Sequence, residues 1–227
     1  LVIADNRLIK LFSRSLPSNV KVLSQDTSLE RLEYDFHIPI GSLPKFFRKQ
    51  PQDFKLASTG FLNADQMRSN LLRKSICKSP KEKLVGLSWH TSSKLPEAQT
   101  RNVDLMTLSM HLVSVGATFI SLQYSYDQLV ENTQNMAGIP IKRAKQIDVF
   151  NDLDGLAALI NACDEVITID NSTAHFAGAL GVSTRLLLPA NSDWRWGQSD
   201  KKSYWYESVH IYRQKTPGSW DEPLGQV

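Results

Sequence analysis

Short apolar runs alternate with helix-like segments between Leu84 and Leu188, and this alternation constrains the fold more than any other feature. One helix-like segment carries Leu156, Leu159 and Ile160 at helical spacing. Strands that alternate with helices form right-handed βαβ units, with parallel strands and helices on both faces. The sequence therefore predicts an α/β fold with a Rossmann-like parallel sheet. Its expected strands are 84–89, 117–123, 139–141, 165–169 and 182–188, and its expected helices are 105–115, 126–136, 153–163 and 172–180.

The N-terminal part of the chain carries fewer elements of the same kind. Strands are expected at 1–4, 20–23 and 34–40, a helix capped by Asp5 or Asn6 runs to about residue 15, and a short helix is expected at 43–48. A further helix at 63–76 is expected to begin at Asn63 and to bury Met67, Leu71 and Leu72.

These patterns predict two units. Residues 1–78 are interpreted as the remainder of an N-terminal α/β domain with a linker helix, and residues 79–227 as a C-terminal Rossmann-like domain. The chain begins at Leu1 inside an apolar run, which we interpret as the start of a fragment.

Composition excludes several classes of protein. The balance of 26 Lys and Arg against 23 Asp and Glu is only mildly basic, so a nucleic-acid partner is not expected. The chain has no apolar stretch of about 18 residues that would span a membrane. Cys77 and Cys163 stand far apart and in no metal-binding spacing. We therefore expect a cytoplasmic protein with no disulfide and no metal site.

The strongest local signal is the segment Asp170-Asn171-Ser172-Thr173-Ala174-His175, which joins an expected strand to an expected helix. The first helical turn is expected to present free amides of Ser172 to Ala174 and two hydroxyls at the carboxyl end of a parallel strand. His175, one turn further, would reach the same ligand. The alternative is an ordinary capped helix with a core histidine.

A second signal follows the expected strand 84–89. The loop contains His90, Thr91 and Ser92, and Arg101 stands just before the next helix. Arginine is permanently charged and binds two phosphate oxygens at once. The alternative is a solvated polar loop.

Two weaker signals are Gln123, at the end of the strand 117–123, and the aromatic residues between Trp194 and Tyr206. A glutamine has both donor and acceptor groups with which to contact a base or a ribose. The aromatic side chains either stack on a sugar or base, or fasten an irregular C-terminal segment to the core. The sequence has no Gly-x-Gly-x-x-Gly fingerprint, which argues against a dinucleotide oxidoreductase.

Taken in order, these motifs resemble glycosyltransferase family 9, the heptosyltransferase-like group, and especially the version fused to tetratricopeptide repeats in bacterial proteins. The resemblance spans nearly the whole chain and rests on the following segments: Arg14–Pro17, Asp35–Pro39, Val85–Trp89, Arg101–Val103, Phe119–Gln123, Leu156–Ile160, Asp170–Gly181, Asp193–Trp196 and Ser203–Tyr206.

The resemblance implies a GT-B-like fold and metal-independent, inverting transfer from a nucleotide-diphosphate sugar, without another cofactor. Arg101, Gln123 and the segment 170–175 would bind this donor substrate, with His90, Thr91 and Ser92 as further contacts. The acceptor and the catalytic residues stay unknown. The family's Gly-rich acidic acceptor loop has no match in residues 1–60, so this chain alone is expected to be inactive in transfer.

Three function classes stay open at this point. The first is a glycosyltransferase or its donor-binding portion. The second is a non-catalytic nucleotide-binding or scaffold module derived from such an enzyme. A nucleotide-sugar epimerase of similar architecture is the third.

Overall fold

The computed structural model of this chain describes residues 1–28, 30, 32–54, 60–124, 131–132, 136, 138–198 and 201–227. Its elements in chain order are β1 (Val2–Ala4), η1 (Asn6–Leu8), α1 (Ile9–Ser15), β2 (Val22–Ser24), η3 (Ile40–Ser42), α2 (Pro44–Phe47), η4 (Pro51–Asp53), α3 (Gln66–Ile76), β3 (Leu84–Ser88), α4 (Pro96–Gln99), α5 (Leu105–Leu112), β4 (Thr118–Ser121), β5 (Ile141–Lys142), α7 (Leu153–Ala162), β6 (Glu165–Ile169), α8 (Ser172–Ala179), β7 (Thr184–Leu188), η5 (Trp194–Trp196), β8 (Val209–Arg213) and α9 (Asp221–Gly225).

A six-stranded sheet in the order β5-β4-β3-β6-β7-β8 forms the centre of the C-terminal unit, and all its named strand pairs are parallel. Counted from β3 as the first strand, this is the 3-2-1-4-5-6 order of a doubly wound Rossmann sheet. The predicted parallel α/β sheet is therefore confirmed. The strand order reverses between β3 and β6, and sheets of this kind bind ligands outside the carboxyl ends of the strands at that point.

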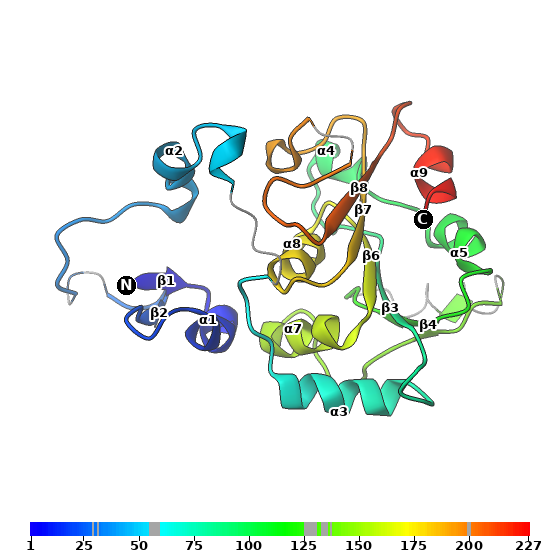
Figure 1. Cartoon of the computed structure of the whole chain (residues 1–227), viewed down its shortest axis with the longest axis horizontal. Helices are drawn as coiled ribbons and strands as arrows, with labels where there is room; N and C mark the ends of the chain where they lie inside the picture. The colour runs from blue at the N-terminus through cyan, green and yellow to red at the C-terminus, as the bar shows by residue number, and fades with distance from the viewer. Residues whose placement is uncertain are drawn as a thin grey trace.

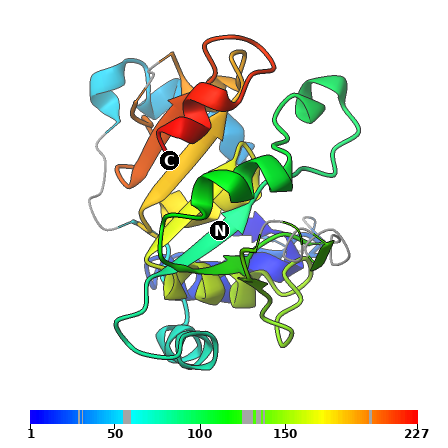
Figure 2. The same ribbon diagram turned by 90° about the vertical axis from the view of Figure 1, so that its right-hand side faces the viewer.

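Helices cover both faces of this sheet. Figure 1 shows the sheet nearly edge-on, with α7 and α8 on its left and α5 and α9 on its right; in Figure 2, α5 and α9 lie in front of it. Every residue of β3 and β6 is buried, as expected for central strands of a parallel sheet. Two clusters of buried side chains, one on each face, fix the layers: one includes Leu159 and Ile160, and the other includes Leu108 and Leu112.

The N-terminal unit is a βαβ arrangement that packs on α7. β1 and β2 pair in parallel, with Val2 opposite Val22, and α1 connects them. The side chain of Leu11 is fully buried in the cluster that contains the α7 residues. Arg14 forms an ion pair with Asp154 of α7. These contacts place the unit beside α7 (Figure 1).

The helix α3 packs along α7, below it in Figure 1. Its cap and its buried face differ from the prediction. Asp65, not Asn63, accepts the capping hydrogen bond, from the amide of Arg68. Met67 and Leu71 are 76% and 62% exposed, because the residues that face α7 are Ser69, Leu72 and Ile76.

The strand predicted at 34–40 is wrong. These residues are irregular up to the 3₁₀ helix η3, and Phe36 is 93% exposed. Pro39 has no amide hydrogen to donate to a sheet, and it immediately precedes η3. Most of the helix predicted at 126–136 lies outside the described residues.

β8 was missed because this edge strand does not read as an apolar run. His210 is exposed, Tyr212 and Arg213 are half-buried, and only Val209 and Ile211 are buried. Within the described residues, no helix combines the length and the apolar character that a membrane crossing needs.

Candidate functional site

A cleft of about 300 Å³ opens at the carboxyl ends of β3, β4 and β6, where the strand order reverses. We call it the switch-point cleft. It is lined by Arg7, Ser88, His90, Thr91, Arg101, Leu122, Gln123, Tyr124, Val149, Phe150, Leu153, Leu156, Asp170, Asn171, Ser172, Thr173 and Phe176. The lining therefore brings together predicted site residues from separate loops, namely His90, Thr91, Arg101, Gln123 and residues 170–173.

Asn171 caps α8 and joins two strands. Its Oδ1 accepts hydrogen bonds from the amides of Thr173 (3.0 Å) and Ala174 (3.4 Å) and from the Thr168 hydroxyl (3.1 Å). Its Nδ2 donates to the Ser88 hydroxyl at 2.8 Å, across the gap between β6 and β3. The expectation of three free amides is therefore wrong for Thr173 and Ala174, because the side chain of the cap residue occupies them.

The polar groups of this turn that face the cleft are fewer than predicted. Ser172 is exposed and occupies the first position of the helix, where the amide has no helical acceptor. Ser172 and Thr173 line the cleft, whereas Ala174 and His175 do not. An anion here would meet the amide and hydroxyl of Ser172 and the hydroxyl of Thr173.

Asp170, which is buried, and Arg101, which is half-buried, form an ion pair in the lining of the cleft. Asp170 is 4% exposed, and its Oδ1 accepts a 2.7 Å hydrogen bond from Nε1 of Trp196. Arg101 Nη1 lies 3.3 Å from the other carboxylate oxygen, Oδ2, and donates to the Asp170 carbonyl at 3.4 Å. Oδ2 makes no hydrogen bond to a described residue. The ion pair with Asp170 argues against a freely solvated Arg101.

Gln123 fixes the β3–β4 edge of the cleft. It is 4% exposed, and its Oε1 accepts from the Ser88 hydroxyl (3.2 Å) and from the amides of Trp89 (3.3 Å) and His90 (3.1 Å). The acceptor oxygen of Gln123 is thus occupied by hydrogen bonds within the protein. The amide nitrogen Nε2 has no partner among the described residues, so a hydrogen bond from Gln123 to a ligand would be donated.

The loop after β3 is only partly in the cleft. His90 and Thr91 line it, and burial lowers the pKa of His90. The amide of Thr91 donates to Oδ1 of Asn102 at 2.8 Å, which holds the loop against the segment before α5. Ser92 is exposed and lies outside the lining, with its hydroxyl 2.5 Å from that of Tyr124.

His175 also lies outside the switch-point cleft. Its ring stacks on Trp196 with centroids 4.7 Å apart, and Nδ1 lies 3.1 Å from the Tyr206 hydroxyl. The pKa of His175 is lowered, and burial of the ring is the largest cause. Trp196 and Tyr206 thus fasten the C-terminal segment to α8. Trp194 is 65% exposed and lines a separate cavity of about 310 Å³ with His175.

Sequence reasoning missed an aromatic wall of the cleft. Tyr124 follows β4 and Phe150 precedes α7, and their ring centroids are 5.1 Å apart. Phe150 is 50% exposed, and Arg7 from the N-terminal unit lies over its ring. Only their position in the sequence could have marked Tyr124 and Phe150. Each stands in a connection that follows a strand, on the edge of the sheet where ligands bind. Nothing in the sequence marked Arg7.

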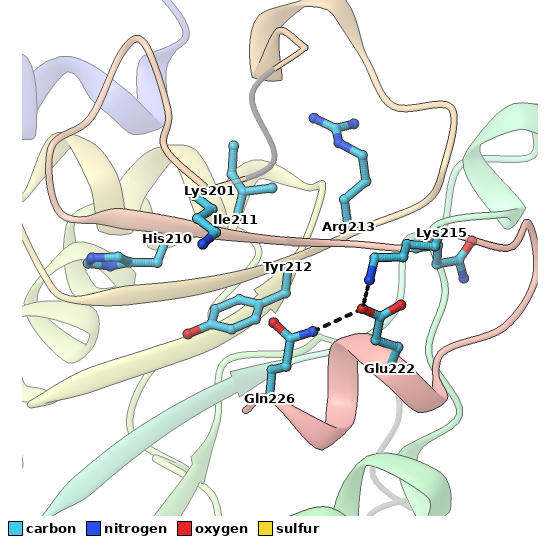
Figure 3. A pocket seen from close by; sticks show the side chains of 9 residues that line it. Lys201, His210, Ile211, Tyr212, Arg213, Lys215, Glu222 and Gln226 are labelled. Carbon is cyan, nitrogen blue, oxygen red and sulfur yellow. Dashed lines mark hydrogen bonds and ion pairs between the residues drawn. The ribbon is translucent and has the colours of Figure 1, made fainter.

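A larger cavity, of about 450 Å³, runs along the edge strand β8 (Figure 3). Figure 3 shows Lys215 pointing toward Glu222, with which it forms an ion pair, and Gln226 donating to the same carboxylate at 3.4 Å. Arg213 donates to the Gly197 carbonyl at 3.1 Å. This cavity lies at the sheet edge rather than at the switch point, and none of the predicted site residues lines it. Among the described residues, no cluster of three or more His, Cys, Asp or Glu residues is arranged to hold a metal ion.

Sequence similarity to known proteins does not assign this chain to a family. No protein-family model matches the sequence. The chain is 28% identical over 239 aligned residues to Protein FlbA of Caulobacter vibrioides, a match that covers 98% of this chain and 39% of FlbA. The chain thus spans less than half the length of the curated relative it matches.

Solved structures give a more specific match. The Escherichia coli ADP-heptose lipopolysaccharide heptosyltransferase II superposes with a TM-score of 0.53 at 16% identity, over 80% of this chain and 56% of that one. The chain has a GT-B-like fold. A glycosyltransferase family 9 structure from Veillonella parvula aligns with a TM-score of 0.44 at 17% identity, over 70% of this chain and 43% of that one.

Proposed function

We propose that this chain is the nucleotide-sugar-binding portion of a glycosyltransferase, and that transfer by the whole protein is inverting and metal-independent. The observation that carries this proposal is the switch-point cleft. Its lining combines a cation and helix-terminal polar groups with two aromatic rings, of which Phe150 is exposed. A nucleoside diphosphate has the matching pair of features, a charged diphosphate and a flat base.

The phosphate end would use Arg101 with Ser172 and Thr173. The first turn of α8 offers the Ser172 amide and the positive end of the helix dipole, and both favour an anion. Arg101 adds a permanent charge and donors on Nε and Nη2 that have no acceptor among the described residues. Asp170 holds the guanidinium in place, so this cation is positioned before a ligand binds.

A non-catalytic binding module is the second candidate, and one observation favours it. Asp170 is the sole carboxylate among the described residues that line the cleft, and it is occupied by Trp196 and Arg101. An inverting transfer needs a base to take the proton of the acceptor hydroxyl. Among the described residues that line the cleft, His90 is then the side chain that could act as this base, unless the base comes from outside the cleft. Fusion to tetratricopeptide repeats and a cytoplasmic location also stay proposals.

The binding claim is tested by thermal unfolding with UDP, GDP and ADP, in EDTA and in Mg²⁺. A ligand at about 100 times its Kd stabilises the folded chain by about 2.7 kcal/mol, so the melting temperature should rise without metal. A rise that requires Mg²⁺ would contradict metal independence. No rise with any nucleoside diphosphate at millimolar concentration would contradict donor binding itself.

Product formation with a panel of nucleotide sugars separates the two candidates. We expect binding without transfer from the 227-residue chain, and transfer from a longer chain that includes the acceptor side. Binding without transfer from both would favour the binding module.

A further inference from the structure

Arg7 is a basic side chain that the N-terminal unit contributes to the switch-point cleft. It belongs to η1, which packs on α7. Its Nη1 donates to the Phe150 carbonyl at 3.0 Å, and its Cζ lies 5.3 Å from the centroid of the Phe150 ring. The guanidinium and the ring are therefore held together in the lining of the cleft.

Asp5 orients this guanidinium and cancels its charge. Arg7 Nε donates to Asp5 Oδ1 at 3.0 Å, and Nη2 lies 2.9 Å from Oδ2. The hydrogen bonds from Arg7 lower the pKa of Asp5 to about 2, so the pair stays ionised at neutral pH and carries no net charge. Arg7 therefore offers a ligand a flat surface and N–H donors rather than a net positive charge.

Two described side chains that line this cleft, Arg7 and Gln123, keep N–H donors for a ligand. Arg7 has five N–H groups, of which three are used by Asp5 and Phe150, and one remains on each terminal nitrogen. Gln123 has its oxygen occupied, so only its Nε2 is left to contact a ligand. The Phe150 carbonyl already accepts from Arg7.

We propose that Arg7, Phe150 and Gln123 form a nucleobase subsite. This proposal rests on the proposed nucleotide-sugar function. The base contacts the exposed part of the Phe150 ring, which Arg7 and Tyr124 leave uncovered, and Arg7 and Gln123 donate to it. The unused donors of Arg7 and Gln123 favour a base that presents carbonyl oxygens, so guanine or uracil binds in preference to adenine. Arginine pairs with the O6 and N7 acceptors of guanine.

The test is isothermal titration of the full chain with GDP, UDP, ADP and inorganic pyrophosphate, repeated with Arg7→Gln. We expect GDP or UDP to bind at least tenfold more tightly than ADP. Arg7→Gln should weaken that binding about tenfold and leave pyrophosphate affinity unchanged, because the base and not the phosphate is contacted. Phe150→Leu is the second variant, and it should weaken the nucleotide but not pyrophosphate.

Arg48→Gln is the matched control. Arg48 also lies over a phenylalanine, with its Cζ 5.7 Å from the Phe54 ring, and donates to the Phe47 carbonyl at 2.8 Å, but it is outside the cleft. It should leave every affinity unchanged. Nucleotide binding with no base preference, or with no effect of either cleft variant, would overturn the subsite and leave the proposed function intact. Weaker pyrophosphate binding in Arg7→Gln would assign Arg7 to the phosphate. If no nucleoside diphosphate binds the unaltered chain, both proposals fail.

Discussion

At the scale of single residues, Asn171 shows how one side chain shapes the cleft. It caps α8 through Oδ1 and ties β6 to β3 through Nδ2. Because the cap occupies two helix amides, the anion contacts move to Ser172 and Thr173. The same side chain therefore stabilises the switch point and limits what a ligand can reach.

Asn171→Ala should lower the free energy of unfolding by about 1–2 kcal/mol, because it removes the helix cap. Asn171→Asp is the matched control, since aspartate keeps the capping oxygen and loses only the donor to Ser88. It should lose less stability than the alanine variant. Urea unfolding measures both, and an alanine variant as stable as the unaltered chain would contradict the assigned role.

His175 predicts a pH dependence of stability. Burial lowers its pKa in the folded chain below the ordinary value of 6.5 that the unfolded chain retains. Below that value the unfolded state binds more protons, so stability is lost as the pH falls. His175→Phe keeps an aromatic ring against Trp196 and does not titrate. The unaltered chain should therefore lose stability relative to this variant between pH 7 and pH 5, measured by urea unfolding; parallel curves would contradict it.

At the scale of elements, α8 is held close to the C-terminal segment by a glycine. A Cβ atom on Gly178 would lie 2.4 Å from Cγ of Tyr206, closer than carbon atoms can approach. Tyr206 also meets His175, so this contact sets the distance between α8 and the segment that follows β7. The small residues of the helix are thus required by packing.

Gly178→Ala should destabilise the chain by about 1–3 kcal/mol through overpacking. Gly225→Ala, in α9, is the control, because no atom lies within 4 Å of its added Cβ. The control should be neutral or slightly stabilising. Thermal unfolding of both variants checks this, and equal effects would show that the contact with Tyr206 is not limiting.

Elements were predictable where local pattern and burial agree. β6 matches its predicted bounds because all five of its residues are buried, and α7 buries Leu156, Leu159 and Ile160 as their spacing predicts. β8 was missed although its alternation of Val209 and Ile211 with polar side chains is typical of a half-buried strand. Arg7 was not predictable, because it reaches the cleft only through the docking of η1 on α7.

At the scale of the whole molecule, the N-terminal unit and the sheet share one core. Leu11 of α1 is fully buried with the α7 side chains, and Arg14 pairs with Asp154. The short β1–β2 pair has few buried residues of its own, so its stability depends on this docking. The placement of Arg7 in the cleft depends on it as well.

Leu11→Ala should cost about 2–5 kcal/mol and shift a single unfolding transition, because the cavity opens in a shared core. Leu71→Ala, at a 62% exposed position of α3, should change stability by less than about 0.5 kcal/mol. Calorimetry of both distinguishes the outcomes. A separate low-temperature transition in Leu11→Ala would show that the N-terminal unit unfolds independently.

The central claim is that the switch-point cleft binds a nucleoside diphosphate, and amide hydrogen exchange with and without a saturating nucleotide tests it most directly. We predict slower exchange in peptides that cover residues 88–102, 148–156 and 170–176, which line the cleft. Arg101→Ala should weaken binding tenfold or more, because a charge-assisted hydrogen bond contributes about 1.5–3 kcal/mol. Lys94→Ala, an exposed cation of the same loop outside the cleft, should not. Protection confined to residues 201–215, at the β8 cavity, or no protection at all would contradict the account.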